Sequence, residues 1–420
     1  MKRPDPIDAL VTDAGGNHAL ATVRSLGRRG LRVAAADSGR CAQASLSRYC
    51  AVRAIYPSPA AGIAPFLEGL DRILEKLRPA VLMPMTERTI LALATDRRRI
   101  EARVRLAPLP SPEAIGTAFD KGETLSLARR LGIPAPRTLQ FDRLPDFAEI
   151  RSRISYPAVV KPRRSETVTA DGRVESSGPP SYCYHADDLE RVYLEVHRRS
   201  SRPLIQEFIP GPGYGVSALC DRGAVRALFA HRRLRMIRPT GSGSSLRESV
   251  APPPIMADAT RALLRALSWH GVAMVEFKLD SRDGVPRLME INGRFWNSLP
   301  LAVASGIDFP FLLYSLAIHG GCPERLDYRV GVKSRWLAGD VRHLMQVLRG
   351  RPAGWTDEFP SRARTLLDFV KFVDRDLHYD DLWATDPMPF LAGVAGGLLS
   401  RLPRPLAPRH QPEAREAPHA

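Results

Sequence analysis

The sequence predicts an α/β protein whose N-terminal part is a parallel β-sheet covered by helices. Over residues 1–110, short apolar segments alternate with amphipathic segments, and turns rich in glycine, aspartate or threonine separate them. This alternation of strand and helix favours parallel strands joined by right-handed crossovers. The expected strands are 7–11, 31–36 and 80–84, and the expected helices are 19–29 and 65–77.

The first strand is followed by Gly15-Gly16, a turn that resembles the one that binds dinucleotides. The full GxGxxG fingerprint is absent, so the sequence does not favour a nicotinamide cofactor. Glycines at such a turn more often allow the next helix to pack closely on its strand.

Composition excludes several classes of protein. Of the 420 residues, 44% are hydrophobic and 25% are charged, which excludes a collagen, a low-complexity disordered chain and a disulfide scaffold. The five cysteines form no CxxC pair and no zinc-ligand spacing with histidine, so we expect reduced thiols in a cytoplasmic protein. No apolar run reaches the length of a membrane span, and none is expected to cross a membrane.

The net charge of +16 permits two interpretations. Basic residues occur in pairs and triplets such as Arg97-Arg98-Arg99, without a long basic block. A solvated arginine-rich surface is favoured over nucleic-acid binding, and no specific nucleic-acid partner is expected. Because the chain has only seven lysines, each one stands out as a compact ammonium group.

Later segments predict further elements and a change of organisation along the chain. Residues 155–205 contain an apolar strand, a polar loop and a helix, which we expect to form a small mobile subdomain, here called the lid. Residues 326–385 are expected to form a helical extension. The Pro- and Arg-rich residues 386–420 are expected to form a partly disordered tail.

One predicted hairpin brings two acidic residues together. Residues 272–279 and 287–292 alternate between apolar and polar, and Asp283-Gly284 between them is a strong turn signal. If residue 280 faces residue 286, then Glu276 lies opposite Glu290, and Asn292 shares their face. The opposite face, which includes Met289, is expected to be core.

Two carboxylates directly opposite each other repel and cost stability. A divalent cation between them would explain the pair, because Glu276, Glu290 and Asn292 offer the oxygen ligands that Mg²⁺ prefers beside phosphates. The alternative, a solvated polar face without a metal, stays open at this point.

The hairpin belongs to a longer set of motifs. Upstream lie Asp120-Lys121, the strand end Val160-Lys161-Pro162, and the stretch 206–211, which reads Gln-Glu-Phe-Ile-Pro-Gly. In this order the motifs resemble the ATP-grasp superfamily, above all its carboxylate–amine ligases and carbamoyl-phosphate-synthase-like single-chain members, over roughly residues 5–320. The resemblance implies a Rossmann-like pre-ATP-grasp domain (1–110) and an α+β ATP-grasp domain (111–325) that carries the lid.

The resemblance also implies roles for individual residues. Lys121 and Lys161 would bind nucleotide phosphates, and Arg294 would stabilise negative charge at the reacting centre, so that Lys161 and Arg294 are the expected catalytic residues. The ligands expected for Mg²⁺, or alternatively Mn²⁺, are Glu276, Glu290 and Asn292. The adenine of ATP would lie against Gln206, Glu207, Phe208 and Ile209.

One feature departs from the family pattern, and a second concerns the substrate. Relatives often have a glutamate after the glycine of the turn, where this chain has Gly211-Pro212-Gly213, so Glu207 would serve the ribose alone. Arg232 and Arg247 flank a Gly/Ser-rich segment and are expected to bind a carboxylate or phosphate of the substrate. A mobile loop with solvated arginines is the alternative for this segment.

The resemblance implies an ATP- and Mg²⁺-dependent ligase that joins a small-molecule carboxylate to an amine through an acyl phosphate. The alternative is an ATP-binding protein of the same fold that is not catalytic. The carboxylate, the amine and the oligomeric state stay open, although a dimer is compatible with the sequence.

Overall fold

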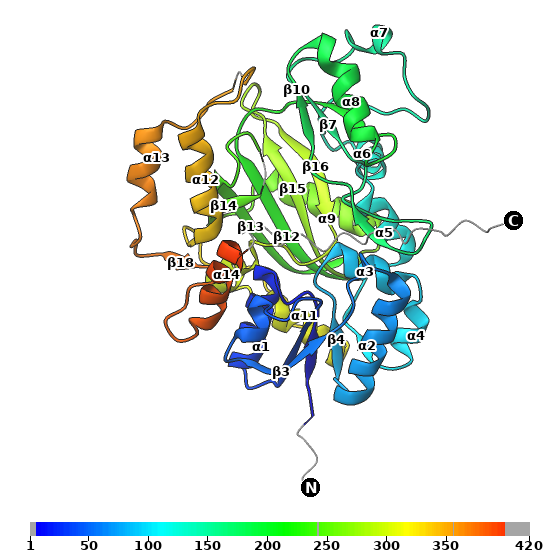
Figure 1. Ribbon diagram of the computed structural model, residues 1–420, viewed down its shortest axis with the longest axis vertical. Helices are drawn as coiled ribbons and strands as arrows, with labels where there is room; N and C mark the ends of the chain where they lie inside the picture. Colours follow the sequence, from blue (N-terminus) through cyan, green and yellow to red (C-terminus); the bar gives the residue numbers. More distant parts are fainter. Residues whose placement is uncertain (1–5, 242, 356, 400–420) are drawn as a thin grey trace, which may run out of the picture.

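The structure, a computed structural model, describes residues 6–241, 243–355 and 357–399. Its N-terminal part is the expected parallel sheet, with five strands in the order β3-β2-β1-β4-β5 (Figure 1). Every pair of neighbouring strands in it is parallel. The strands are β1 (Ala9–Val11), β2 (Val33–Asp37), β3 (Cys50–Ile55), β4 (Val81–Met83) and β5 (Arg105–Leu106).

Helices cover both faces of this sheet, because the central strand β1 directs apolar side chains to each face. Ala9 and Val11 pack into one core cluster with α1, and Leu10 packs into another with α2. Strand β3 was not predicted, because its residues alternate between half-buried and exposed at the sheet edge. The helices are α1 (Asn17–Arg28), η1 (Gln43–Leu46), α2 (Ile63–Leu77), α3 (Glu87–Ala94) and α4 (Arg97–Glu101).

A larger sheet of seven strands forms the centre of the molecule (Figure 1), in the order β16-β15-β12-β13-β14-β17-β18. Neighbouring strands are antiparallel except for the last pair. The strands are β12 (Gly213–Asp221), β13 (Ala224–Met236), β14 (Ser244–Val250), β15 (Gly271–Leu279), β16 (Pro286–Asn292), β17 (Lys333–Arg335) and β18 (Leu377–Tyr379).

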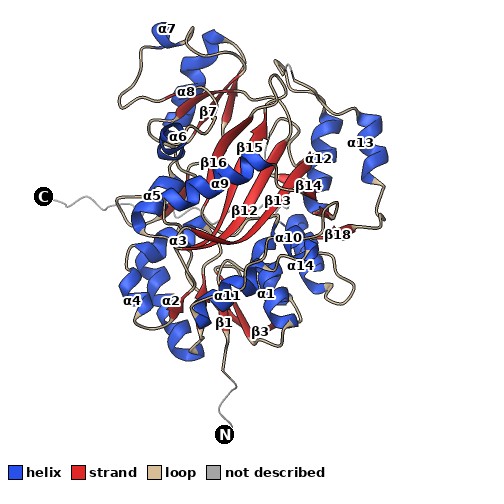
Figure 2. Ribbon diagram, turned by 180° about the vertical axis from the view of Figure 1, so that it is seen from behind, coloured by secondary structure: helices blue, strands red, loops and turns tan. Residues whose placement is uncertain are grey.

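The two faces of the central sheet bury different helices. Val275 and Phe277 pack on one face in a cluster that includes α5 and α9, and Figure 2 shows α9 lying across this face. Val272 and Met274 pack on the other face against α10, α11 and the N-terminal part. Alternation along β15 therefore directs Glu276 and Lys278 to the side of the N-terminal part. The helices are α5 (Pro112–Phe119), α6 (Lys121–Arg130), α9 (Pro254–Ala266), α10 (Leu299–Ser305) and α11 (Phe309–His319).

A third, four-stranded sheet in the order β10-β7-β11-β6 lies beside the central sheet (Figure 1). It packs on α8 around a small core of its own. It includes β6, so this unit begins before the expected residue 155. Its elements are β6 (Thr138–Leu139), α7 (Phe147–Ile150), β7 (Ala158–Lys161), the hairpin β8 (Glu166–Val168) and β9 (Val174–Ser176), β10 (Ser181–Cys183), η2 (Ala186–Asp188), α8 (Leu189–His197) and β11 (Leu204–Glu207).

The C-terminal part corrects the expectation of a helical extension. Residues 326–385 contain α12 (Leu337–Arg349) and α13 (Arg362–Phe369), but also β17 and β18, which extend the central sheet. Asp386, the first residue of the expected tail, is buried, and α14 (Met388–Leu399) follows it and lies near α1 (Figure 1). The expected tail residues 400–420 lie outside the described residues. The domain boundaries from the sequence stay a prediction.

Within the described residues, no single helix is long and apolar enough to cross a membrane. In the part of the chain that the structure describes, α10 and α11 together reach that length and composition, as a pair bent by 88°. Most of their apolar side chains are buried in the core beside the N-terminal part. All five cysteines are free thiols.

Candidate active site

Strands β15 and β16 form the expected antiparallel hairpin with the acidic pair. Glu276 lies directly opposite Glu290, as predicted. The register shifts by one residue next to this pair, so that Phe277 faces Leu288 and not Met289. Because of this bulge, Leu288 is buried in the core and Met289 lines a cavity on the other face. The prediction that Met289 belongs to the core is therefore wrong.

Asn292 and Arg294 extend the acidic pair on the same side. The side-chain nitrogen of Asn292 donates to one oxygen of Glu276 and one of Glu290, both at 3.2 Å. Nη2 of Arg294 donates to the amide oxygen of Asn292 at 3.0 Å. Together with Glu276 and Glu290, these two residues form one connected group.

Cations compensate the charge of Glu290. Nζ of Lys121 lies 3.4 Å from a carboxylate oxygen of Glu290 and donates to the hydroxyl of Ser165 at 3.1 Å. Burial disfavours the ionised form of Glu290 and raises its pKa. The positive charges of Lys121, Lys161 and Arg294 and a hydrogen bond from Asn292 outweigh the effect of burial, so that the pKa of Glu290 is lowered to about 2. The carboxylate is therefore available as an anionic ligand at neutral pH.

The second predicted phosphate-binding lysine, Lys161, ends β7. Its Nζ donates to Oε1 of Gln206 at 2.6 Å, and Nε2 of Gln206 donates to Thr138 at 2.9 Å. Burial lowers the pKa of Lys161 to about 8, although Glu290 partly offsets this effect. Gln206 is only 1% exposed and does not line the cavity. Its side chain therefore orients Lys161, and the structure does not bring it to a ligand as predicted.

Pairing across four strands determines which residues share the face of the acidic pair. His231 pairs with Gly215, Gly215 with Glu276, and Glu276 with Glu290, so these residues form one row across the sheet. A Cβ atom at Gly215 would lie 2.3 Å from the His231 ring. The glycine therefore leaves room for the side chains on either side of it.

Arg232, one position beyond this row, does not reach the cavity. Nη2 of Arg232 pairs with Glu248 at 3.0 Å, and 44% of its side chain is exposed. Its neighbour Arg233 lines the cavity and places Nη2 2.5 Å from a carboxylate oxygen of Glu276. The structure thus places Arg233, and not the predicted Arg232, beside the acidic pair. Side chains two residues apart on a strand share a face, so Arg233 lies on the same face as His231, which is in the row of Glu276. This alternation is the sequence signal that would have identified Arg233.

These groups line a cavity of about 730 Å³. Gln206 and Arg232 lie outside its lining. The other predicted residues line it, namely Lys121, Lys161, Glu207, Phe208, Ile209, Arg247, Glu276, Glu290, Asn292 and Arg294. Lining residues that the sequence analysis missed include Asn17, Arg233, Lys278, Trp296, Trp336 and Arg342.

The stretch expected to hold adenine already has several internal bonds. Glu207 accepts the backbone N–H of Arg137 at 2.8 Å through Oε1 and a bond from Arg282 at 3.2 Å through Oε2. The carbonyl oxygen of Ile209 accepts a bond from the ammonium group of Lys278. The backbone N–H of Ile209 meets no acceptor among the described residues. This N–H is therefore available to a ligand in the cavity.

An aromatic cluster supports this stretch from two sides. Nζ of Lys278 lies 4.8 Å from the ring centroid of Phe208, and burial lowers the pKa of this lysine to about 8. Trp355 packs edge-on against Phe208 with ring centroids 5.3 Å apart. Tyr182 of β10 lies 5.5 Å from the Trp355 centroid. The stretch is thus held between the small sheet and the C-terminal part.

Arg247 reaches the cavity lining but has structural partners. It is 1% exposed, and its Nη2 pairs with the carboxylate of Asp380. Nη2 also donates to the backbone oxygen of Asn297 at 3.2 Å, and Nη1 to that of Ser244 at 3.2 Å. This arginine therefore connects β14 with β18. The predicted role of Arg247 in binding a substrate anion is not supported, because a carboxylate of the chain already neutralises it.

The N-terminal part also contributes to the cavity. The N–H of Gly15 donates to Asp37 at 2.9 Å, which closes the turn after β1. Asn17, the first residue of α1, lines the cavity, and its Nδ2 lies 3.4 Å from Asp380. The glycine turn therefore places the start of α1 at the cavity.

The acidic face fits a divalent cation that is held together with phosphates. Among the described residues, no three His, Cys, Asp or Glu side chains gather around one point. The face offers two carboxylates and one amide, and Mg²⁺ is usually bound by one or two carboxylates together with phosphate and water oxygens. The Asn292 amide already contacts both carboxylates. Rotation of this amide exchanges its nitrogen for an oxygen ligand.

At the tip of the hairpin, Asp280 is fully buried. Its Oδ1 accepts a bond from Nε of Arg282 at 2.8 Å, and its Oδ2 one from Nη2 at 2.6 Å. These hydrogen bonds lower the pKa of Asp280 to about 2, against about 3.9 in an unfolded chain. A carboxylate with a lowered folded pKa contributes stability that is present above the unfolded pKa and is lost as pH falls through the folded pKa.

We expect the Asp280→Asn variant to unfold at a lower urea concentration than wild type near neutral pH, with a deficit of about 2 kcal/mol. The deficit should shrink as the pH falls from about 5 toward 2, because wild-type Asp280 then becomes protonated as well. Urea unfolding at a series of pH values measures this. Asp283→Asn, at an exposed position of the same turn, is the control. A deficit that does not change with pH would contradict the assignment.

The fold and the cavity together define a class of protein, and this chain is a member of the ATP-grasp superfamily. The family described as ATP-grasp in the biosynthetic pathway with Ter operon matches residues 199–339. That segment includes residues 206–211, the stretch expected to hold adenine, and the hairpin with Glu276 and Glu290. The resemblance predicted from the sequence is therefore confirmed.

Two curated relatives are carbamoyl phosphate synthase large chains. The chain is 25% identical over 329 residues to the N-terminal section of the carbamoyl phosphate synthase large chain of Methanopyrus kandleri, covering 73% of this chain and 56% of that protein. It is 33% identical over 142 residues to the carbamoyl phosphate synthase large chain of Rubrobacter xylanophilus, covering 31% of this chain and 13% of that one. The chain thus spans little more than half of these relatives' length, or less.

Solved structures share the fold. Biotin carboxylase from Campylobacter jejuni, in a β-γ-ATP complex, superposes with a TM-score of 0.59 at 16% identity, covering 78% of this chain and 74% of that one. L-amino acid ligase from Bacillus licheniformis superposes with a TM-score of 0.53 at 19% identity, covering 75% of each chain. At this level of identity the likeness shows the fold alone.

Proposed function

We propose that this protein is an ATP- and Mg²⁺-dependent ligase that activates a small-molecule carboxylate as an acyl phosphate and joins it to an amine. The observation that carries the proposal is the acidic group Glu276–Glu290–Asn292 facing Lys121 and Lys161 in one cavity. Relatives named as ligases, such as the D-alanine–D-alanine ligase of Marinomonas at 28% identity over 127 residues, support the reaction type.

Each part of a nucleotide would meet a suitable group of the cavity lining. The N–H of Ile209 would donate to a ring nitrogen of adenine, and Phe208 would contact the ring. Glu207 lines the cavity beside them and would accept a bond from a ribose hydroxyl. Lys121 and Lys161 would bind the phosphates as compact cations. Mg²⁺, or Mn²⁺ in its place, would bind to Glu276, Glu290 and Asn292.

ATP supplies the γ-phosphoryl group: a substrate carboxylate oxygen bonds to γ-phosphorus as the bond to ADP breaks, and an amine nitrogen then displaces phosphate and loses a proton. The residues of the chain position these groups and neutralise charge. Lys161 would balance the charge of the phosphoryl group in transfer. Arg294, two residues beyond Asn292, would stabilise the negative charge on the oxygens of the reacting phosphoryl group or tetrahedral centre. The small sheet, the predicted lid, would exclude water.

We propose a small-molecule carboxylate and a small-molecule amine as the binding partners. A cytoplasmic location agrees with the five free thiols, because a reducing compartment keeps cysteines in that form.

A non-hydrolysable ATP analogue is expected to raise the unfolding midpoint of the wild-type protein, and more with Mg²⁺ than without, because it binds only the folded state. Lys161→Met is expected to remove this rise. Lys333→Met is the matched control, because Lys333 pairs with Asp374 outside the cavity. Pools of carboxylates and amines are then screened for ADP release. An unchanged wild-type midpoint with the analogue and Mg²⁺ would refute the proposal.

A further inference from the structure

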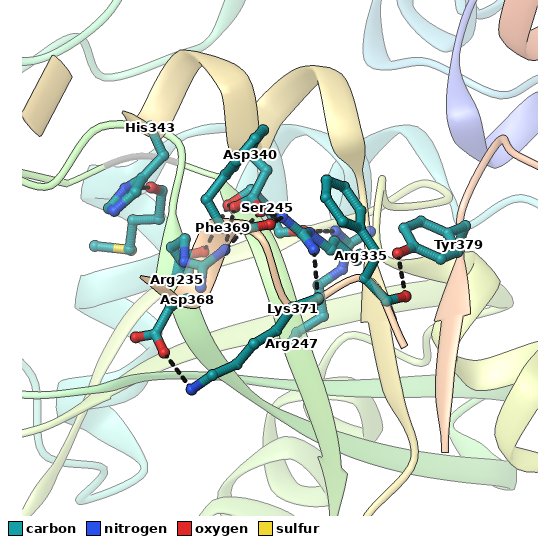
Figure 3. A network of polar contacts seen from close by, with 12 residues as sticks. Arg235, Ser245, Arg247, Arg335, Asp340, His343, Asp368, Phe369, Lys371 and Tyr379 are labelled. Carbon is teal, nitrogen blue, oxygen red and sulfur yellow. Dashed lines mark hydrogen bonds and ion pairs between the residues drawn. The ribbon is translucent and has the colours of Figure 1, made fainter. Parts of the chain in front are cut away.

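Helix α12 is fixed on the central sheet by a buried ionic network (Figure 3). Asp340 is fully buried and pairs at 2.6 Å with Arg235 of β13 and at 2.6 Å with Arg335 of β17. The hydroxyl of Ser245 donates to Asp340 at 3.0 Å. The ring of His343 lies 2.6 Å from a backbone oxygen of β13. Because Asp340 and Arg335 are both buried, this network gives α12 a defined position beside the cavity.

Helix α12 and the residue before it place two side chains at the cavity. Trp336, which precedes α12, donates its backbone N–H to Ser245 at 2.8 Å. The guanidinium carbon of Arg342 lies 5.5 Å from the ring centroid of Trp336, and both residues line the cavity. Among the described residues, no carboxylate pairs with Arg342. Stacking on a ring orients a guanidinium and leaves its N–H groups available to a ligand.

The cavity lining carries more positive charge than the proposed reactants neutralise. Among the described lining residues nine are cationic and three are acidic. Asp380 and Asp120, which lie outside the lining, pair with two of the cations, Arg247 and Arg164. Arg238 is left out of the charge balance because it takes part in another interaction. Arg282, also outside the lining, pairs with the acidic Glu207. A nucleoside triphosphate with one Mg²⁺ brings about two net negative charges, and the reacting carboxylate brings one. A positive excess is left when both are bound.

We propose that the substrate carries a second anionic group, a carboxylate or a phosphate, in addition to the carboxylate that reacts, and that Arg342 stacked on Trp336 binds this group. The inference rests on the proposed function, because the excess charge is counted with the nucleotide and one carboxylate in place. Arg342 lies beyond residues 199–339, which the family match covers. A guanidinium suits either group because it donates two parallel hydrogen bonds.

The test compares paired probes that differ by one anionic group. Isothermal titration of the full chain uses succinate against butyrate, and phosphoglycolate against glycolate, with and without Mg²⁺ and the ATP analogue. One charge-assisted hydrogen-bonded contact predicts about tenfold tighter binding of at least one two-anion probe than of its partner. Arg342→Gln is expected to remove this preference, and Arg342→Lys to keep part of it. Arg349→Gln, an exposed arginine on α12 outside the lining, should keep all of it.

Each outcome decides the proposal. A preference for succinate identifies a second carboxylate, and one for phosphoglycolate identifies a phosphate. Equal binding within both pairs, no binding of either two-anion probe, or a preference that survives in Arg342→Gln would overturn the inference. Failure of the proposed function is recognised separately, since the ATP analogue alone would then not bind. The comparison without nucleotide still measures the anion preference in that case. Unfolding midpoints of the variants show that each one is folded.

Discussion

Replacement of Glu290 by glutamine is expected to lower Mg²⁺-dependent ATP turnover by about a hundredfold or more. Glu290 accepts a bond from Asn292 at 3.2 Å and lies 3.4 Å from Nζ of Lys121. Glutamine keeps the shape of the side chain but removes the charge that would bind the cation. The two lysines beside it would then repel each other without an anion between them.

Turnover is measured as ADP release with a responsive carboxylate and amine, over a range of Mg²⁺ concentrations. Glu248→Gln is the matched control, because Glu248 lies on the same sheet but pairs with Arg232 outside the cavity. Both variants should unfold at close to the wild-type temperature. Wild-type turnover in Glu290→Gln at every Mg²⁺ concentration would show that Glu290 is not a metal ligand.

Replacement of Asp386 by alanine is expected to destabilise the fold by about 3–5 kcal/mol. Asp386 accepts a bond from Nε of Arg24 at 2.8 Å, from the hydroxyl of Ser47 at 2.7 Å and from the N–H of Arg48 at 2.9 Å. Arg24 and Asp386 are only 1% and 2% exposed. Alanine would leave the Arg24 charge buried without its partner, which is the costly case for a buried ion pair.

The urea concentration at half-unfolding measures the effect. Glu101→Ala removes the partner of the half-exposed Arg97, and a loss below about 1 kcal/mol is expected there. The double variant Arg24→Met/Asp386→Leu removes both charges and should regain much of the lost stability. A loss no larger in Asp386→Ala than in Glu101→Ala would show that the C-terminal segment does not stabilise the fold through this ion pair.

The acidic face was predictable because its signals are local. Alternation along a strand tells which residues share a face, and a two-residue turn signal sets the register of its hairpin. Both signals lie within residues 272–292, and Glu276 does face Glu290. The same reasoning failed at Met289, because a bulge adds one residue to a strand without any change in the alternating pattern.

Other errors concern residues whose partners are far away in the chain. Arg232 and Arg233 look alike in the sequence, and only the pairing of β13 with β12 and β15 decides which one faces Glu276. Arg247 resembles a free binding arginine until β18 brings Asp380 to it, 133 positions later. An arginine that has a buried carboxylate partner serves the fold and not a ligand.

The sequence by itself determined the class of this protein and most residues of the candidate site, because the order of Lys121, Lys161, Glu276 and Glu290 along the chain does not depend on how the side chains pack. Only the tertiary structure decided what the C-terminal part does. Its strands extend the central sheet, Asp386 binds Arg24 from 362 positions away, and α12 brings Arg342 to the cavity. Hydrophobic periodicity reports which face of an element is buried, but it does not report which distant charge lies against that face.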